Sequence, residues 1–169
     1  YPGPAAIRYP RGTGPGVNIE TNMTPLEIGK GRLVRKGTQI AILSFGTLLS
    51  SALSAADEIG ATVADMRFVK PLDTALIDSL TDSHTLLVTL EENVIAGGAG
   101  SAVCEYLNQQ GRCIPVLQLG LPDQFIDHGK HPQLLSDIGL DSNGIIGSIR
   151  RRSASIPELH ASLSAAAQS

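Results

Sequence analysis

The chain has 169 residues, of which 42% are hydrophobic and 17% charged, and its formal net charge is −3. This composition supplies a core for one ordinary domain and excludes a disordered chain. The slightly acidic balance, the lack of Trp and the 4% aromatic content argue against a nucleic-acid surface, and no apolar run approaches the roughly 18 residues that a membrane span needs.

The first dozen residues resemble the end of a structural unit rather than its start. A strand-like run at 5–7 leads to Pro10, which cannot continue a ladder, so we expect the strand to stop just before it. Arg8 and Arg11 then lie at a strand end, where open α/β sheets place ligands. Two guanidinium groups there can bind a phosphate or carboxylate, and a basic surface turn is the simpler alternative. We therefore expect this chain to be the later part of a larger protein.

Strand and helix patterns alternate after residues 13–25, which are rich in Gly, Pro, Thr and Asn and predict a linker. The expected strands are 28–34 (half exposed), 39–45, 61–66, 85–90 and 114–119. The expected helices are 47–58, 71–80, 101–110, 134–138 and 142–152. Such alternation favours a mostly parallel sheet covered on both faces, so we predict a three-layer α/β/α fold.

Several residues signal where helices begin and end. Thr47 is the expected N-cap of the first helix, and Gly60 marks its end. Pro71 suits the first turn of the second helix, with Asp73 near the positive end of its dipole. Asp141 is a candidate cap for the helix that starts at about residue 142.

The two cysteines, Cys104 and Cys113, fit neither a CxxC motif nor a zinc knuckle. One falls in a predicted helix and the other enters a predicted strand, so we expect buried free thiols. Free thiols favour a reducing cytoplasm.

The glycine-rich segment 97–101 is a first candidate site. Glycines between a strand and a helix can cradle a phosphate, but the pattern is not GxGxxG, and Glu91 and Glu92 precede it. We favour close packing of helix and strand backbones, with Ser101 as a cap. The two glutamates resemble a general-acid pair. Because neighbouring strand residues point to opposite faces, we instead predict a capping or buried interface role.

A second candidate lies around two histidines. His128 and His131 are candidate metal ligands together with Asp123 or Asp127, but an intervening glycine and a following proline favour a solvated loop. His84, at a strand edge, carries no signal of its own. No Ser-His-Asp arrangement is recognisable, so the sequence shows no self-sufficient active site.

Four stretches of the sequence are shared with a known family. They are AIRYPRG at 6–12, DMRFVKPLD at 65–73, EEN at 91–93 with GGAGS at 97–101, and GLPD at 120–123 with FI at 125–126. Up to about residue 150 the chain resembles the C-terminal part of the 1-deoxy-D-xylulose-5-phosphate synthase family, thiamine-diphosphate enzymes of the transketolase superfamily. The second and third stretches recur in transketolases and 2-oxoacid dehydrogenase β subunits, whereas the first and fourth indicate the synthase.

The resemblance implies a domain organisation and a reaction. Residues 1–12 would end a pyrimidine-binding domain, 13–25 would be an interdomain linker, 26–152 a transketolase-like C-terminal domain and 153–169 a tail. The implied reaction joins pyruvate to D-glyceraldehyde 3-phosphate with loss of CO2, giving 1-deoxy-D-xylulose 5-phosphate for isoprenoid, thiamine and pyridoxal biosynthesis. Thiamine diphosphate and Mg2+ would be held by segments upstream of Tyr1 in a cytoplasmic homodimer.

Within this chain the resemblance implies one contact with substrate. Arg11 matches the family arginine that binds the phosphate of D-glyceraldehyde 3-phosphate, and Arg8 matches its neighbour, with a weaker case. No catalytic, cofactor-binding or metal-binding residue maps here, so the chain alone is expected to be inactive. Two alternatives stay open: the C-terminal domain of a transketolase or 2-oxoacid dehydrogenase β subunit, and a non-catalytic α/β binding module.

Overall fold

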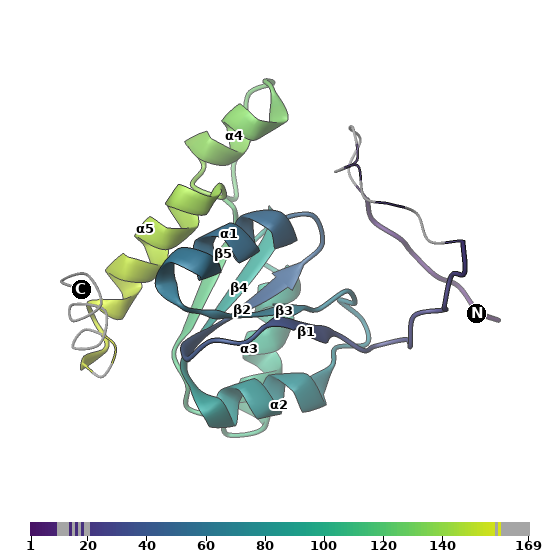
Figure 1. Ribbon diagram of the computed structural model, residues 1–169, viewed down its shortest axis with the longest axis horizontal. Helices are drawn as coiled ribbons and strands as arrows, with labels where there is room; N and C mark the ends of the chain where they lie inside the picture. Colours follow the sequence, from purple (N-terminus) through teal and green to yellow (C-terminus); the bar gives the residue numbers. More distant parts are fainter. Residues whose placement is uncertain (10–13, 15, 17, 19–20, 158, 160–169) are drawn as a thin grey trace.

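One five-stranded sheet organises the chain, in the order β1-β3-β2-β4-β5 (Figure 1). The computed structural model describes residues 1–9, 14, 16, 18, 21–157 and 159. The strands are β1 (Arg32–Arg35), β2 (Gln39–Phe45), β3 (Thr62–Asp65), β4 (His84–Val94) and β5 (Val116–Leu121). Only β1 runs antiparallel to its neighbour among these strands, so the predicted mostly parallel sheet is confirmed.

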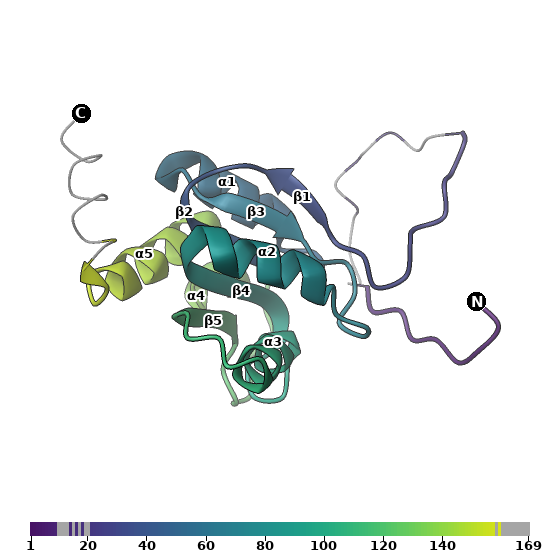
Figure 2. The same cartoon turned by 90° about the horizontal axis from the view of Figure 1, so that it is seen from below.

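Helices cover both faces of the sheet (Figures 1 and 2). They are α1 (Leu49–Ile59), α2 (Thr74–Ser83), α3 (Ala99–Gln109), α4 (His131–Asp137) and α5 (Ser142–Ser153). Apolar side chains of α1 and α5 pack on one face, and those of α2 and α3 pack on the other. The predicted three-layer α/β/α architecture is therefore confirmed. Among the described residues, every helix is too short or too polar to traverse a bilayer.

The apolar run of β2 reflects this double cover. Ile40 and Ile42 contribute to the core under α1 and α5, whereas Ala41 and Leu43 contribute to the core under α2 and α3. All four are at most 2% exposed. A strand buried on both sides favours apolar residues at consecutive positions, which is why residues 40–43 do not alternate between apolar and polar.

Three of the predicted helix-boundary signals, Gly60, Asp73 and Asp141, are confirmed. Gly60 ends α1 in the left-handed conformation, with φ at 69°. Asp73 accepts a hydrogen bond from the Leu76 amide at 3.1 Å, and Asp141 caps α5 in the same way. Pro71 was wrongly expected inside the first turn of a helix, because the Asp73 cap starts α2 at Thr74.

The predicted cap at Thr47 is wrong. Helix α1 begins two residues later, and its N-cap, Leu48, makes no side-chain hydrogen bond to the helix. The Thr47 hydroxyl instead donates to Glu92, from a different strand end. The Glu92 carboxylate is a stronger acceptor, so the Thr47 hydroxyl binds it and does not cap the helix.

Two further sequence predictions need correction. Residues 5–7 form no strand, and side chains at 1–9 are exposed, since no sheet edge pairs with them here. Cys104 is half-buried on α3, but Cys113 is exposed because it lies in the loop before β5 begins at Val116. The predicted domain limits at 1–12, 13–25, 26–152 and 153–169 stay predictions.

Candidate functional site at the carboxyl edge of the sheet

Neighbouring strands β2 and β4 mark the place where the chain reverses its direction across the sheet. After β2 the chain enters α1 on one face, and after β4 it enters α3 on the other face (Figure 1). Because the two connections diverge, the carboxyl ends of these strands mark the topological switch point of the sheet. Ligands of open α/β sheets bind at such switch points, so this edge is the candidate site.

A β-bulge shapes the end of β4. In the pairing with β5, Leu90 lies opposite Leu119 and Val94 opposite Leu121, so residues 91–93 face the single Gly120. A Cβ at Gly120 would lie 2.7 Å from the Asn93 carbonyl oxygen, which explains the glycine. Bulges turn side chains away from the regular pleat, and this one carries both glutamates of the EEN stretch.

Glu91 caps helix α3. It is 3% exposed, and its two carboxylate oxygens accept the backbone N–H groups of Ala99 and Gly100, each at 2.8 Å. The carboxylate thus satisfies two N–H groups that a helix start leaves open and complements the helix dipole. The predicted capping role is confirmed.

The glycines of segment 97–101 allow helix and strand to approach closely, as predicted. A Cβ at Gly98 would lie 2.5 Å from both Glu91 Oε2 and the Val94 carbonyl oxygen. Ser101 does not cap α3, because Glu91 already fills that position. The Ser101 hydroxyl accepts a hydrogen bond from the Gly97 amide at 3.1 Å and donates one to the Ile95 carbonyl at 2.9 Å, which stabilises the loop.

Glu92 points to the other side and gathers residues from distant parts of the chain. Its Oε2 accepts a hydrogen bond from the Thr47 hydroxyl at 2.7 Å, and its Oε1 lies 2.7 Å from His131 Nε2. The guanidinium of Arg8 donates to the backbone carbonyl of Glu92. The end of β4, the β2–α1 loop, the start of α4 and the N-terminal segment therefore meet at one carboxylate.

The Glu92 carboxylate is held in its charged form. Partial burial by itself would raise its pKa, but hydrogen bonds from Thr47 and His131, together with the positive charges of His131 and Arg8, lower the pKa below its ordinary value. A fixed negative charge thus lies at this edge of the sheet. It favours cationic groups there and disfavours a free phosphate.

The histidine candidate does not assemble as a metal site. His131 begins α4 and contacts Glu92, whereas His128, Asp123 and Asp127 are exposed in the loop before it. Within the described part of the chain, no three His, Cys, Asp or Glu side chains are grouped so as to hold a metal ion. The interpretation as a solvated loop agrees with the surroundings of His128.

The DMRFVKPLD stretch serves the architecture of the sheet edge. Asp65 accepts a hydrogen bond from Arg32 on β1 at 3.2 Å and pairs with Arg67 at 3.6 Å. Asp73 caps α2 and also accepts the Gly31 amide at 3.0 Å, which fastens the chain before β1. These contacts keep the antiparallel edge strand in place.

Sequence reasoning missed the convergence on Glu92. Thr47 and Glu92 each lie at the carboxyl end of a buried parallel strand, and that shared placement was a usable signal. His131 offered none, because its approach depends on how the 122–130 loop returns to the sheet. Arg11, the main predicted phosphate ligand, lies outside the described residues, whereas Arg8 lies within them and contacts Glu92.

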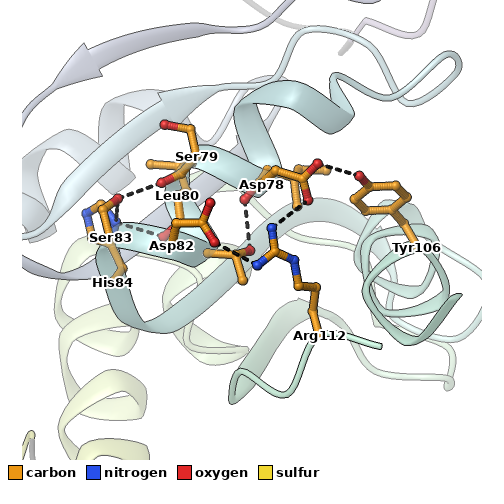
Figure 3. A network of polar contacts seen from close by, with 10 residues as sticks. Asp78, Ser79, Leu80, Asp82, Ser83, His84, Tyr106 and Arg112 are labelled. Atoms are coloured by element: carbon orange, nitrogen blue, oxygen red, sulfur yellow. Dashed lines mark hydrogen bonds and ion pairs between the residues drawn. The ribbon is translucent and has the colours of Figure 1, made fainter. Parts of the chain in front are cut away.

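A second polar network lies at the opposite, amino edge of the sheet (Figure 3). The Tyr106 hydroxyl on α3 donates to Asp78 on α2 at 2.7 Å. Arg112, in the loop before β5, donates to Asp82 at 2.7 Å and pairs with Asp78 at 3.7 Å. Nearby, His84 contacts the hydroxyl of Thr62 at 2.8 Å. This network ties adjacent elements together and borders no strand carboxyl end.

The folded domain matches one known family. Residues 29–145 match the family described as "Transketolase, C-terminal domain", and the chain belongs to it. It is also 62% identical over 145 residues to 1-deoxy-D-xylulose-5-phosphate synthase of Cellvibrio japonicus, covering 86% of this chain and 23% of that protein. For the enzyme of the same name from Hahella chejuensis the identity is 57% over 152 residues, with coverages of 90% and 24%.

A solved structure shows the same arrangement. The chain described as "Split gene transketolase, inactive beta4 tetramer" superposes with a TM-score of 0.67 at 31% identity, covering 76% of this chain and 42% of that one. The chain spans about a quarter of the length of the curated relatives that it matches. The resemblance predicted from the four shared stretches is confirmed at the level of the family.

Proposed function

We propose that this chain is the C-terminal part of a thiamine-diphosphate-dependent transferase that joins pyruvate to D-glyceraldehyde 3-phosphate, releasing CO2 and forming 1-deoxy-D-xylulose 5-phosphate. The observation that carries the proposal is the identity of 62% over 145 residues to a relative bearing that synthase name. The product would serve isoprenoid, thiamine and pyridoxal biosynthesis, and the enzyme would work as a cytoplasmic homodimer.

In this proposal Arg11 binds the substrate phosphate. A guanidinium group holds a phosphate dianion through paired N–H donors, which a point charge cannot do. Arg8 lies three residues earlier and reaches the carboxyl edge of the sheet, where it contacts Glu92. That placement brings one of the two predicted arginines to this edge.

The described residues of this chain do not fit the cofactor or its metal. The N-terminus of α3 is the position where α/β folds most readily receive a diphosphate, but the Glu91 carboxylate already occupies its N–H groups. The fixed charge on Glu92 would repel a second anion nearby. Thiamine diphosphate and Mg2+ would accordingly be held by preceding segments of the enzyme, and we assign no cofactor chemistry to this chain.

The same edge has features of a surface that other parts of the enzyme cover. Val69, in the loop after β3, is 53% exposed, and Phe125, after β5, is fully exposed. Both loops follow the carboxyl ends of parallel strands, so they emerge at the same edge of the sheet as Glu92. Burial of these apolar side chains against the upstream polypeptide or the dimer partner would be favourable.

Substitution of Arg11 in the full-length enzyme tests the proposal. Arg11→Ala should raise KM for D-glyceraldehyde 3-phosphate on the order of tenfold to a hundredfold, because a hydrogen bond to a charged group is worth about 1.5–3 kcal/mol. Release of CO2 from pyruvate should be largely unchanged. Arg151→Ala, on the exposed side of α5, is the matched control and should leave both quantities unaffected. An unchanged KM in Arg11→Ala would refute the assignment.

The alternatives predict different substrate requirements. A 2-oxoacid dehydrogenase β subunit would need no sugar phosphate, and a transketolase would accept a ketose donor in place of pyruvate. Formation of product from pyruvate only when the phosphorylated aldehyde is present would support the synthase. A non-catalytic module would show neither reaction in any assembly with upstream segments.

A further inference from the structure

The stretch that follows β5, residues 122–133, has little packing to hold it to the folded domain, and we refer to it as the strap. Residues 123–133 are all exposed, and helix α4, whose first residues end the strap, contains no buried residue. This helix extends past the ends of the strands (Figure 1). Segments with few buried apolar contacts open at a lower free energy than the core beside them. The strap therefore depends on individual contacts for its position.

His131 joins the strap to the sheet. Its Nε2 lies 2.7 Å from Oε1 of Glu92, at the end of β4. In the part of the chain that the structure describes, no other hydrogen bond or ion pair links the strap to a strand. When this contact breaks, no polar group of the sheet holds the strap in place.

The chain is fixed just outside each end of the strap. Before it, the Leu121 carbonyl accepts a hydrogen bond from the Ile95 amide at 3.1 Å. After it, Leu135 and Ile138 pack against the core under α1 and α5. Because both ends are held, breaking the contact moves the strap and leaves the rest of the domain folded.

The contact between Glu92 and His131 is oriented but weak. The Thr47 hydroxyl holds the other carboxylate oxygen at 2.7 Å, so the carboxylate has a fixed direction. The Glu92 side chain is 20% exposed and the His131 side chain 54% exposed, so water competes for the imidazole. Pairs with an exposed partner contribute little stability, so this one opens and closes readily.

We propose that the strap is a gate at the carboxyl edge of the sheet and that the contact between Glu92 and His131 is its latch. In the closed state, His131 covers Oε1 of Glu92. In the open state the strap moves away from the edge, and this oxygen becomes available to a cationic group of a ligand. The position of Phe125, a fully exposed side chain within the strap, changes with it. This gate does not depend on the proposed reaction.

Trypsin cleavage after Lys130 measures the opening of the strap, because this exposed lysine immediately precedes His131. The rate follows the population of the open state when opening is fast relative to cleavage. Glu92→Gln and His131→Ala in the full chain should each raise it about twofold to fivefold, the range for a partly exposed pair. Each rate is divided by that of a free peptide of residues 126–135 with the same residue at position 131. Thr47→Val, which frees only the other carboxylate oxygen, should raise the rate less.

Further variants separate a latch from a general loss of structure. The double variant Glu92→Gln, His131→Ala should be cleaved no faster than the faster single variant, because both changes break one contact. Glu58→Gln is the matched control, since it removes a carboxylate that pairs with Arg150 at 2.9 Å, and it should leave the rate unchanged. Cleavage after Arg112, at the amino edge, should stay as slow as in wild type. Unchanged cleavage after Lys130 in Glu92→Gln and His131→Ala, or an equal acceleration after Arg112, would overturn the latch.

Discussion

Both edges of the parallel sheet carry polar networks, but one network links packed elements and the other links loops and the N-terminal segment. At the amino edge, Asp78, Tyr106 and Arg112 link residues no more than 34 positions apart (112 − 78), on elements that already pack together (Figure 3). At the carboxyl edge, Glu92 contacts Thr47, 45 positions earlier, and Arg8, 84 positions earlier. The first network fastens neighbours, and the second brings loops and the N-terminal segment together.

The comparison teaches where to look for function in this fold. Both edges are rich in charge, so charge density alone does not distinguish them. Strand direction does, because in a parallel sheet all loops that follow the strands emerge at one edge. The carboxyl edge also buries the Glu91 carboxylate at 3% exposure, whereas the Asp78 and Arg112 side chains of the amino-edge network are 37% and 36% exposed. We expect substitutions at the two edges to differ accordingly.

The largest expected effect is loss of the Glu91 cap. Glu91→Ala would leave two buried N–H groups of α3 without acceptors and a small cavity, so it should destabilise the chain by about 2–4 kcal/mol. Glu91→Gln keeps the shape and one acceptor, and it should cost less. Urea unfolding measures both, with Glu105→Ala on the exposed side of α3 as the control. A cost for Glu91→Ala no larger than that of the control would remove the contrast between the edges.

The next effect concerns close packing at the start of α3. Gly98→Ala would place its Cβ 2.5 Å from the immobile Val94 carbonyl, so we expect a loss of about 1–3 kcal/mol. Gly147→Ala is the matched control, because its Cβ would meet nothing closer than 3.9 Å inside α5. That change should stabilise by up to about 1 kcal/mol through helix propensity. A lower unfolding midpoint for Gly98→Ala and a higher one for Gly147→Ala, each relative to wild type, would confirm the distinction.

A smaller effect follows from the charge on Glu92. Since its pKa is lowered in the folded state, the stability it contributes is complete above the unfolded value of about 4.3 and is lost as the pH falls through the folded pKa. Wild type should therefore exceed Glu92→Gln in stability at pH 7, by less than about 1 kcal/mol for a partly exposed pair. The difference should shrink in acid. A stability difference between wild type and Glu92→Gln that grows as the pH falls would contradict a lowered Glu92 pKa.

The smallest expected effect concerns the titration of Tyr106 in the amino-edge network. The hydrogen bond from the Tyr106 hydroxyl to Asp78 raises the pKa of that tyrosine, with partial burial adding to it. Asp78→Asn removes the charge, so the tyrosinate should form at lower pH, nearer its ordinary value. Ultraviolet titration of the three tyrosines follows the change. Asp82→Asn, whose carboxylate binds Arg112 instead, should move the Tyr106 titration much less. A shift in Asp82→Asn as large as that in Asp78→Asn would show that the network acts as one unit.

Local patterns in the sequence determined most of the architecture. Each of the successful signals depends on neighbouring residues. They are the apolar run of β2, the alternation of strands and helices, the helix end at Gly60 and the helix starts at Asp73 and Asp141. Each depends on burial or backbone geometry within a few positions, which a sequence displays directly. The opposite orientation of Glu91 and Glu92 was predictable for the same reason, because adjacent strand residues alternate.

Only the tertiary structure decided which distant groups meet. Thr47 has the residue type of a helix cap, yet the crossover of β4 beside β2 supplies it with the Glu92 carboxylate instead. The exposure of Cys113 and the contact of His131 with Glu92 likewise depend on where loops end and return. Sequence periodicity records which face of an element is buried. It does not record which element arrives opposite that face, because that choice is made by the packing of the whole sheet.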